Sequence, residues 1–518
     1  MRLAARLPLF AALLFTAQAR AAGLNPATAT IPDLQAALSA GRLTSTQLVQ
    51  FYLARIRRID QGANGLHAVI AINPNALKDA EARDRQRKSL AHPGPLYGIP
   101  ILVKDNIDTA DPMPTTAGSL ALIHNYRKDA PVIARLRAAG VIILGKTNLS
   151  EWANYRSSNA TSGWTAVGGL TRNPYDLSRT ACGSSSGSAA AVAAGLAPAA
   201  IGTETDGSVT CPSSMQGLVG LKPSVGLVSR TGVVPISHSQ DTPGPMAHTA
   251  ADAALLMSVM TGHDPRDPAT LGAPDLAAEF AHVSAAPLAG VRLGVWRYPA
   301  NALPMVDPLY GQTLDALKRA GAVLVPIPMP DTTKISQDEA IVLKTEIKPD
   351  MAHYLKDAPP AVTSRTLADL IAFNARTPAE TRWFGQDLFE AAEQTQGLTD
   401  PAYLTARAES ARLAGPDGID QMLKANDLAA IIAPTTGPAW KIDLVLGDNG
   451  GVPAAGTLPA VAGYPHLTVP MGLVDGLPVG LSFIGARFGD ARMLALGAAF
   501  QTITPPLPPP GFAPHLAP

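Results

Sequence analysis

The stretch CGSSSGSAAAVAAGLAPAAIGTETDGSVTCP, residues 182–212, contains two serine-rich turns joined by small apolar residues. The first turn is GSSSGS, residues 183–188, and the second is GTETDGS, residues 202–208. The connecting segment carries no charge, so it can be buried and can hold the two turns at a fixed separation. Glycines allow backbone N–H groups to approach a ligand closely, and serine hydroxyls supply nucleophiles and proton carriers. This arrangement suits acyl transfer, provided that another part of the chain supplies a base.

Around this stretch, segments with strand and helix patterns alternate along the chain. Short apolar runs between helices are typical of a largely buried sheet. We therefore predict an α/β fold, with a single large domain over residues 22–503 and a mixed, largely buried central β-sheet surrounded by helices. Expected strands cover residues 66–72, 99–103, 141–144, 199–202, 291–296, 322–326, 428–433, 466–470 and 479–484, and expected helices cover residues 32–38, 45–59, 76–88, 130–139, 188–194, 310–320 and 490–501.

Two segments depart from this alternation. Residues 331–418 are mostly helical in pattern and more polar than their surroundings, and they could cap a substrate site. Residues 504–518 are rich in proline and include the run PPLPPP, so we expect this tail to be extended or disordered.

The N-terminus has the pattern of a secretory signal peptide. Two arginines, Arg2 and Arg6, precede an apolar run over residues 7–17, and the tripeptide ARA, residues 19–21, fits a small-x-small cleavage site. The apolar run is too short for a permanent membrane span, and a buried N-terminal helix is the alternative interpretation. We predict that residues 1–21 are a signal peptide cleaved near Ala21, and that the mature protein is periplasmic or secreted.

The charge balance and the cysteine content limit the kinds of binding partner that we expect. The 518 residues include 41 basic and 41 acidic side chains, so the zero net charge gives no reason to expect nucleic acid or an anionic membrane. The two cysteines, Cys182 and Cys211, have no neighbouring histidine pair, and we expect neither a metal nor a cofactor. Export would permit a disulfide between them, and two buried free thiols are the equal alternative. The oligomeric state stays open, and a monomer is compatible with the sequence.

Three kinds of site could use the serines. GSSSG, residues 183–187, matches the G-x-S-x-G pattern of a Ser-His-Asp hydrolase, with Ser185 as nucleophile and His238 or His248 as base. That pattern requires a preceding strand, however, and residues 176–181 are not strand-like. A phosphate-binding loop would need a Gly-Lys-Ser/Thr sequence after the glycines, and none follows. The third possibility is a relay of two serines and a lysine.

Lys104 is the candidate base for such a relay. It follows LYGIPILV, residues 96–103, and so lies at the carboxyl end of an expected buried strand. Burial lowers the pKa of a lysine because the charged form loses its hydration. A decrease of about 2–3 units from about 10.4 would make a usable neutral base.

Several motifs together resemble the amidase signature family. The resemblance is dense over residues 31–262 and returns over residues 458–500, where PVGLSFIG is similar to the family. Within the family, the branch of bacterial peptide amidases is the most similar, on SEWAN, CGSSSGSA, GTETDGS and VSRTGVVPISHSQDT. The family-like motifs are GTETDGS and GLVGLKPS in the run that starts at Cys182, IPILVKDN and GKTNLSEWA upstream, and SRTGVVPISHSQDTPGPM downstream.

The resemblance implies a role for individual residues. Ser208 matches the nucleophile that forms an acyl-enzyme, Ser184 matches a bridging serine that follows a cis peptide bond, and Lys104 matches the base. Backbone N–H groups in the second turn match the oxyanion hole, which binds the developing negative charge. These N–H groups belong to Thr205, Asp206 and Gly207.

The sequence departs from the broad family near the nucleophile. Glu204, Asp206 and Thr210 stand where many members have Asp, Gly and Arg, and the peptide amidase branch shares these changes. Charge pairing that is inferred from distant relatives is therefore not to be expected here. The roles of Ser185 and Ser186 stay open between supporting the loop and acting directly.

These features predict a serine amidohydrolase that converts primary amides to carboxylic acid and ammonia. The resemblance favours C-terminal peptide amides, so the expected partner is a small-molecule or peptide amide. Alternatives are a broad amidase for small aliphatic or aromatic amides, a glutamine-dependent amidotransferase subunit, and a non-catalytic binding protein that reuses the fold.

Overall fold

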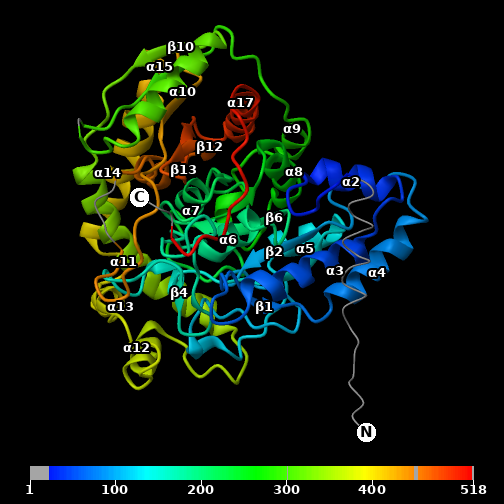
Figure 1. Ribbon diagram of the computed structural model, residues 1–518. Helices are drawn as coiled ribbons and strands as arrows, with labels where there is room; N and C mark the ends of the chain where they lie inside the picture. Colours follow the sequence, from blue (N-terminus) through cyan, green and yellow to red (C-terminus); the bar gives the residue numbers. More distant parts are fainter. Residues whose placement is uncertain (1–22, 300, 449–452, 516–518) are drawn as a thin grey trace.

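One 11-stranded mixed sheet organises the part of the chain that the computed structural model describes, residues 23–299, 301–448 and 453–515. The strand order is β1-β3-β2-β6-β8-β7-β12-β13-β11-β9-β10, and Figure 1 shows helices packed around these strands. The predicted α/β fold with a mixed central sheet is thereby confirmed. The strands are β1 (Val69–Ile72), β2 (Pro100–Lys104), β3 (Ile142–Thr147), β6 (Ala199–Glu204), β7 (Val219–Lys222), β8 (Thr242–Ala247), β9 (Arg292–Val295), β10 (Val323–Pro326), β11 (Ala430–Pro434), β12 (His466–Val474) and β13 (Leu477–Ile484), and β4 (Trp164–Thr165) pairs with β5 (Gly169–Leu170) in a separate ribbon.

Parallel and antiparallel strand pairs occupy different parts of this sheet. β2 lies between β3 and β6 and is parallel to both, and β9 is parallel to β10 and β11. The strands between these two groups, from β6 to β11 in the sheet order, pair in antiparallel fashion. Because β2 and β6 are parallel neighbours, their carboxyl ends lie at the same edge of the sheet, and both ends carry the candidate site residues.

Two strands of the central sheet were missing from the sequence prediction, as was the short β4–β5 ribbon. β7 is only four residues long, and β8 has the sequence TPGPMA, whose prolines argue against a central strand. β8 nevertheless pairs with β6 along its whole length. It pairs with β7 only through Met246 and Ala247, so Pro243 and Pro245 lie outside that short ladder.

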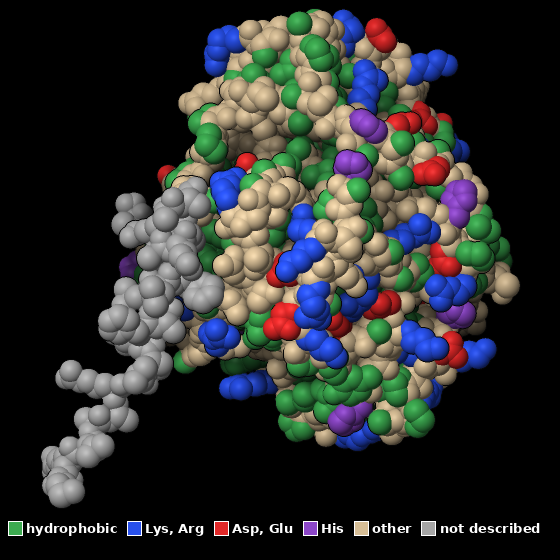
Figure 2. Space-filling model, turned by 90° about the vertical axis from the view of Figure 1, so that its right-hand side faces the viewer, with side chains coloured by type: hydrophobic (Ala, Val, Ile, Leu, Met, Phe, Trp, Pro, Cys, Tyr) green, Lys and Arg blue, Asp and Glu red, His purple; other side chains and the backbone are tan. Residues whose placement is uncertain are grey.

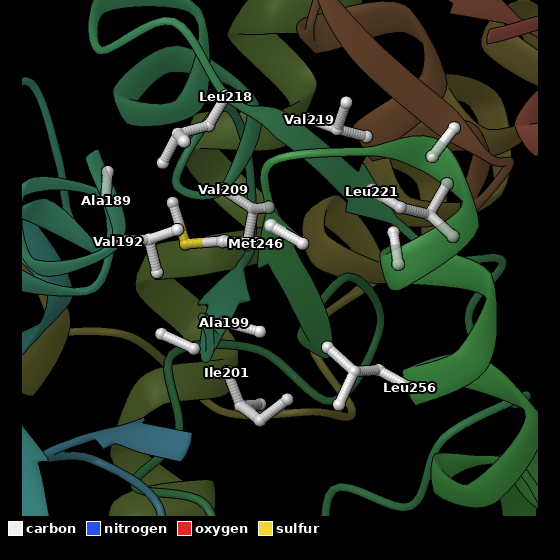
Figure 3. Close-up of a cluster of buried hydrophobic side chains, with 14 of the residues drawn as sticks. Ala189, Val192, Ala199, Ile201, Val209, Leu218, Val219, Leu221, Met246 and Leu256 are labelled. Carbon is white, nitrogen blue, oxygen red and sulfur yellow. The ribbon is translucent and has the colours of Figure 1, made fainter. Parts of the chain in front are cut away.

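Helices cover both faces of the central strands. Figure 3 shows Met246 beside Val192 and Val209 on one side of the sheet, while Ile201 lies toward Leu256 on the other. These side chains are fully buried. The helices are α2 (Ile31–Ser39), α3 (Ser45–Arg55), α4 (Ala76–Arg87), α5 (Pro131–Ala138), α6 (Ser186–Ala193), α7 (Thr210–Met215), α8 (Ala250–Met260), α9 (Ala277–Ala281), α10 (Asp307–Arg319), α11 (Thr333–Lys356), α12 (Leu367–Ala375), α13 (Asp387–Glu393), α14 (Pro401–Ala414), α15 (Gln421–Ala425), α16 (Thr457–Ala462) and α17 (Asp490–Ile503).

The two segments that depart from the alternation have defined structures. Residues 331–418 contain α11 to α14, as the helical pattern predicts. The described part of the proline-rich tail, residues 504–515, is extended and packs on the body of the protein: Phe512 N–H donates to the Pro174 carbonyl at 3.0 Å, and Leu177 N–H donates to the Ala513 carbonyl at 2.9 Å. The expected signal peptide, residues 1–21, lies outside the described residues.

The described surface is mixed in charge. Figure 2 shows acidic and basic side chains interspersed over one face, in keeping with the balanced composition. Across the described ranges, no helix has the length and apolar character needed to cross a membrane.

Candidate active site

The fold brings the two serine-rich turns into contact. Ser184 follows a cis peptide bond after Gly183 and lies two residues before the start of α6, whereas Ser208 lies between β6 and α7. Ser185 N–H donates to the carbonyl of Ser208 at 3.0 Å, so the backbones of the two turns are joined. A disulfide between the cysteines that flank the turns links them a second time. The open question between a disulfide and two free thiols is thus answered in favour of the disulfide.

Close packing explains the glycine that precedes Ser184. A Cβ atom added at Gly183 would lie 2.2 Å from Ser150 Oγ, which no real contact allows. Ser150 N–H also donates to the Ser184 carbonyl at 2.9 Å. The residues that follow, Trp152 to Asn154, all have positive φ, an uncommon backbone conformation that clusters at functional sites.

Lys104 lies at the end of β2 and is fully buried. Its Nζ is 2.7 Å from Ser184 Oγ, 2.8 Å from Thr203 Oγ1 and 3.2 Å from the Thr203 carbonyl oxygen. Burial lowers the pKa of Lys104 to about 7, although the charges of Asp241 and Glu204 favour protonation. A neutral Lys104 can donate its two N–H groups to Thr203, which leaves the nitrogen lone pair free to accept the Ser184 proton.

Burial alone does not single out Lys104. Lys146 in β3 and Lys222 in β7 are also fully buried. Lys146 Nζ donates to the Ile107 carbonyl at 2.6 Å, and Lys222 Nζ donates to the Pro223 carbonyl at 3.1 Å. Only Lys104, among the described lysines, contacts Ser184.

The turn formed by residues 205–207, which we call the 205–207 turn, precedes Ser208. Within the described chain, none of its three N–H groups has a hydrogen-bond acceptor, so all three are available to a ligand. Gly207 has φ +79°, a conformation that glycine adopts without strain. The side chains on either side fix the turn: Thr205 Oγ1 donates to Asp241 Oδ1 at 2.6 Å, and Thr457 Oγ1 donates to Asp206 Oδ2 at 2.8 Å.

Glu204 binds the backbone that follows Ser208, the candidate nucleophile. Its Oε2 accepts hydrogen bonds from Val209 N–H at 2.7 Å and from Thr210 N–H at 2.8 Å, and it lies 3.2 Å from Thr210 Oγ1. The buried carboxylate therefore spans the two residues that follow Ser208.

Ser185 and Ser186 hold the loop. Ser185 Oγ is fully buried, accepts from Thr203 N–H at 3.1 Å and donates to the Thr203 carbonyl at 3.0 Å. Ser186 Oγ donates to the Cys182 carbonyl. His238, one base weighed for a Ser185 nucleophile, bonds through its ring to Asp350 instead. The geometry therefore favours the supporting role for both serines.

Several residues at the site were given no role by the sequence analysis. Thr203 and Asp241 lie within motifs that resemble the family but carried no assigned role. Gln240 Nε2 is 3.4 Å from the Thr205 carbonyl and donates to Glu339 Oε1 at 2.8 Å. Glu339 belongs to α11, so the helical segment reaches the 205–207 turn through one glutamine.

One described cluster has ligand types that metals use. His238, Glu346 and Asp350 place ligand atoms within 4.8 Å of one another. Glu346 already accepts hydrogen bonds from Ser237, Ser239 and Tyr403, the last at 2.7 Å. These donors satisfy the hydrogen-bonding capacity of the Glu346 carboxylate without a metal ion.

Comparison with known proteins agrees with this geometry. The model of the Amidase family matches residues 47–494. The structure of native peptide amidase from Stenotrophomonas maltophilia is 48% identical with a TM-score of 0.88, and that of peptide amidase PAM with the competitive inhibitor chymostatin is 49% identical with a TM-score of 0.89; each alignment covers 93% of this chain and 98% of the other. A protein of Arabidopsis thaliana named a probable amidase is 38% identical over 498 residues, which cover 93% of this chain and 91% of the relative. The chain therefore belongs to the Amidase family and is an amide-hydrolysing enzyme.

Proposed function

We propose that this enzyme is a serine amidohydrolase that hydrolyses primary amides, with C-terminal peptide amides as its preferred substrates. The observation that carries the proposal is the 2.7 Å contact between the buried Lys104 Nζ and Ser184 Oγ, next to the turn that bears Ser208. The peptide preference rests on the similarity to peptide amidases. Family membership sets the non-catalytic alternative aside.

The first half of the reaction forms the tetrahedral intermediate that leads to an acyl-enzyme on Ser208. Ser208 Oγ attacks the amide carbonyl carbon and passes its proton to Ser184 Oγ, while the Ser184 proton moves to neutral Lys104. The carbonyl oxygen becomes an oxyanion that the free N–H groups of the 205–207 turn can hold. Removal of one such donor in a comparable hydrolase costs about 2.7–4 kcal/mol of transition-state stabilisation.

The second half returns the protons and frees the acid. Protonated Lys104 gives its proton back through Ser184 to the amide nitrogen, the C–N bond breaks, and ammonia leaves. Water then attacks the ester on Ser208, and the same relay accepts its proton. Ser208 is regenerated and the carboxylic acid departs.

Ammonia release from a panel of peptide amides, small free amides and esters tests the proposal. We expect peptide amides to have the highest kcat/KM, and Ser208→Ala to lower kcat by at least about a thousandfold. Ser185→Ala is the matched control, since it removes a neighbouring hydroxyl that bonds to Thr203 and to no member of the relay. Activity confined to small free amides would favour the broad amidase, and an acyl-enzyme trapped on Ser208→Ala would overturn the assigned nucleophile.

The helical segment, residues 331–418, extends the proposal to the choice of substrate. We expect that exchanging residues 331–418 for those of a small-amide amidase changes substrate preference, because Glu339 in this segment reaches the 205–207 turn through Gln240. An unchanged preference would refute the capping role.

We also propose a periplasmic or secreted enzyme, from the signal pattern of residues 1–21. N-terminal sequencing of the enzyme from fractionated cells should then begin near Ala22, and a cytosolic enzyme that keeps residues 1–21 would contradict export.

A further inference from the structure

Two carboxylates, one within the 205–207 turn and one beside it, have side chains with no role in the proposed chemistry. Asp206 is part of the turn, and Glu339 comes from α11. Glu339 Oε1 accepts from Gln240 Nε2 at 2.8 Å, and that nitrogen lies 3.4 Å from the Thr205 carbonyl oxygen. Glu339 is thus separated from the peptide unit of the turn by a single side chain.

Each carboxylate keeps one oxygen without a hydrogen-bond partner among the described residues. Glu339 is only 8% exposed, and its Oε2 makes no hydrogen bond there. Asp206 binds Thr457 through Oδ2, and its Oδ1 has no donor in the same set. Neither oxygen is a fully enclosed unpaired atom, so both keep some exposure and can be reached by a ligand.

No lysine or arginine of the described chain forms an ion pair with either carboxylate. The neighbouring acids on α11 differ in this respect, since Asp338 pairs with Lys334 and Glu346 lies 3.8 Å from Arg407. The cations behind the turn, Lys104 and Lys222, direct their nitrogens to other oxygens, as described above. The charge of Lys222 still lowers the pKa of Asp206 without a direct ion pair, and the open side of the turn becomes negative once the two carboxyl groups ionise.

The Gln240 side chain places Glu339 near Thr205, the residue before Asp206, so the charge of Asp206 influences the pKa of Glu339. Burial, followed by the charge of Asp206, raises the pKa of Glu339 to about 8. Burial also raises the pKa of Asp206 to about 6, and the charge of Glu204 adds to that rise. Each group thus adds negative charge to the same space once it ionises, and both are ionised at pH 9.

We infer that Asp206 and Glu339 make the enzyme discriminate between the neutral amide that it hydrolyses and the carboxylate that it produces. A primary amide and the corresponding carboxylate have almost the same shape, so shape alone cannot separate them. The carboxylate acquires its charge next to Ser208 and is repelled by the acidic pair, whereas an amide N–H can approach the open oxygens. The reaction product and peptides that end in a free carboxylate are thereby kept from occupying the site. The inference rests on the proposed acyl-transfer site at Ser208.

The test compares inhibition by the acid product with binding of the amide. For the best amide of the ammonia-release panel, we would measure KM and the inhibition constant of its free acid at pH 9, in the wild type and in Glu339→Gln. We expect the inhibition constant to fall about tenfold in the variant, as loss of a repulsion of about 1.4 kcal/mol implies, while KM for the amide changes less than about twofold. Glu339→Asp keeps the charge and should retain most of the wild-type discrimination.

Control variants separate the charge effect from a change in structure. Asp338→Asn removes a charge from the adjacent position on α11, where Lys334 already balances it, and should leave the inhibition constant as in the wild type. Asp206→Asn removes the other charge of the pair and should strengthen inhibition as Glu339→Gln does, which keeps the inference testable if Glu339→Gln misfolds. Equal inhibition constants in the wild type and in both neutralising variants would overturn it. Because any hydrolysed amide serves, a failure of the peptide preference is distinguishable from a failure of this inference.

Discussion

Replacing Lys104 with methionine would remove a fully buried amine and keep a side chain of similar length. Burial holds the pKa of Lys104 at about 7 instead of 10.5, so the neutral base becomes available near neutral pH. In the wild type, kcat/KM should rise about tenfold per pH unit below pH 7 and level off above it. In Lys104→Met, kcat should fall by at least about a thousandfold at every pH.

The same substitution should change how stability depends on pH. The pKa of Lys104 is lower in the folded state than in the unfolded state, so the unfolded chain binds more protons between about pH 7 and pH 10.5. Wild-type stability therefore gains from this group as pH rises through that window. The whole shift corresponds to about 5 kcal/mol, of which about 3 kcal/mol falls between pH 6 and pH 9. Methionine exchanges no proton, and the other titrating groups are common to both proteins.

Urea denaturation at pH 6 and pH 9 measures this difference. The free energy of unfolding should rise by about 3 kcal/mol more in the wild type than in Lys104→Met. Lys128→Met, which removes an exposed lysine, should behave as the wild type. If the wild type and Lys104→Met show the same change between the two pH values, Lys104 is not desolvated as the structure indicates, and the argument for a neutral base fails.

Three further outcomes follow from contacts around the serines. Replacing Cys182 and Cys211 with alanine should lower the free energy of unfolding by about 3–4 kcal/mol, because the disulfide closes a loop with a sequence separation of 29; an unchanged urea midpoint would contradict this. Gly183→Ala places a methyl group 2.2 Å from Ser150 Oγ, so kcat should fall more than about tenfold and stability by about 1–3 kcal/mol; full activity in an ammonia assay would show that the loop adapts. Ser185→Ala breaks two hydrogen bonds to β6 and should destabilise the protein by about 1–3 kcal/mol in thermal denaturation while keeping measurable turnover, whereas complete loss of turnover in a folded variant would reinstate Ser185 as nucleophile.

More of the candidate active site could be predicted from the sequence than of the segments that pack around it. Ser208, Ser184 and Lys104 lie in local motifs whose residue types suit acyl transfer, and the structure brings Ser184 and Lys104 into contact. Glu339 could not be predicted, because it is one acid on a long polar helix and gains its place only when α11 packs over Gln240. A long-range hydrogen bond of this kind leaves no local pattern.

The sequence by itself determined the apolar runs that become most strands of the sheet and the two turns that carry the serines. Those features depend on neighbouring residues, through side-chain periodicity and glycine conformations. Tertiary structure alone decided that TPGPMA forms the central strand β8, since pairing with β6 outweighs the low strand preference of proline. It also decided which of three buried lysines faces Ser184, and how far burial lowers the pKa of Lys104. Desolvation depends on all the atoms packed around a group, and segments far apart in the sequence contribute most of them.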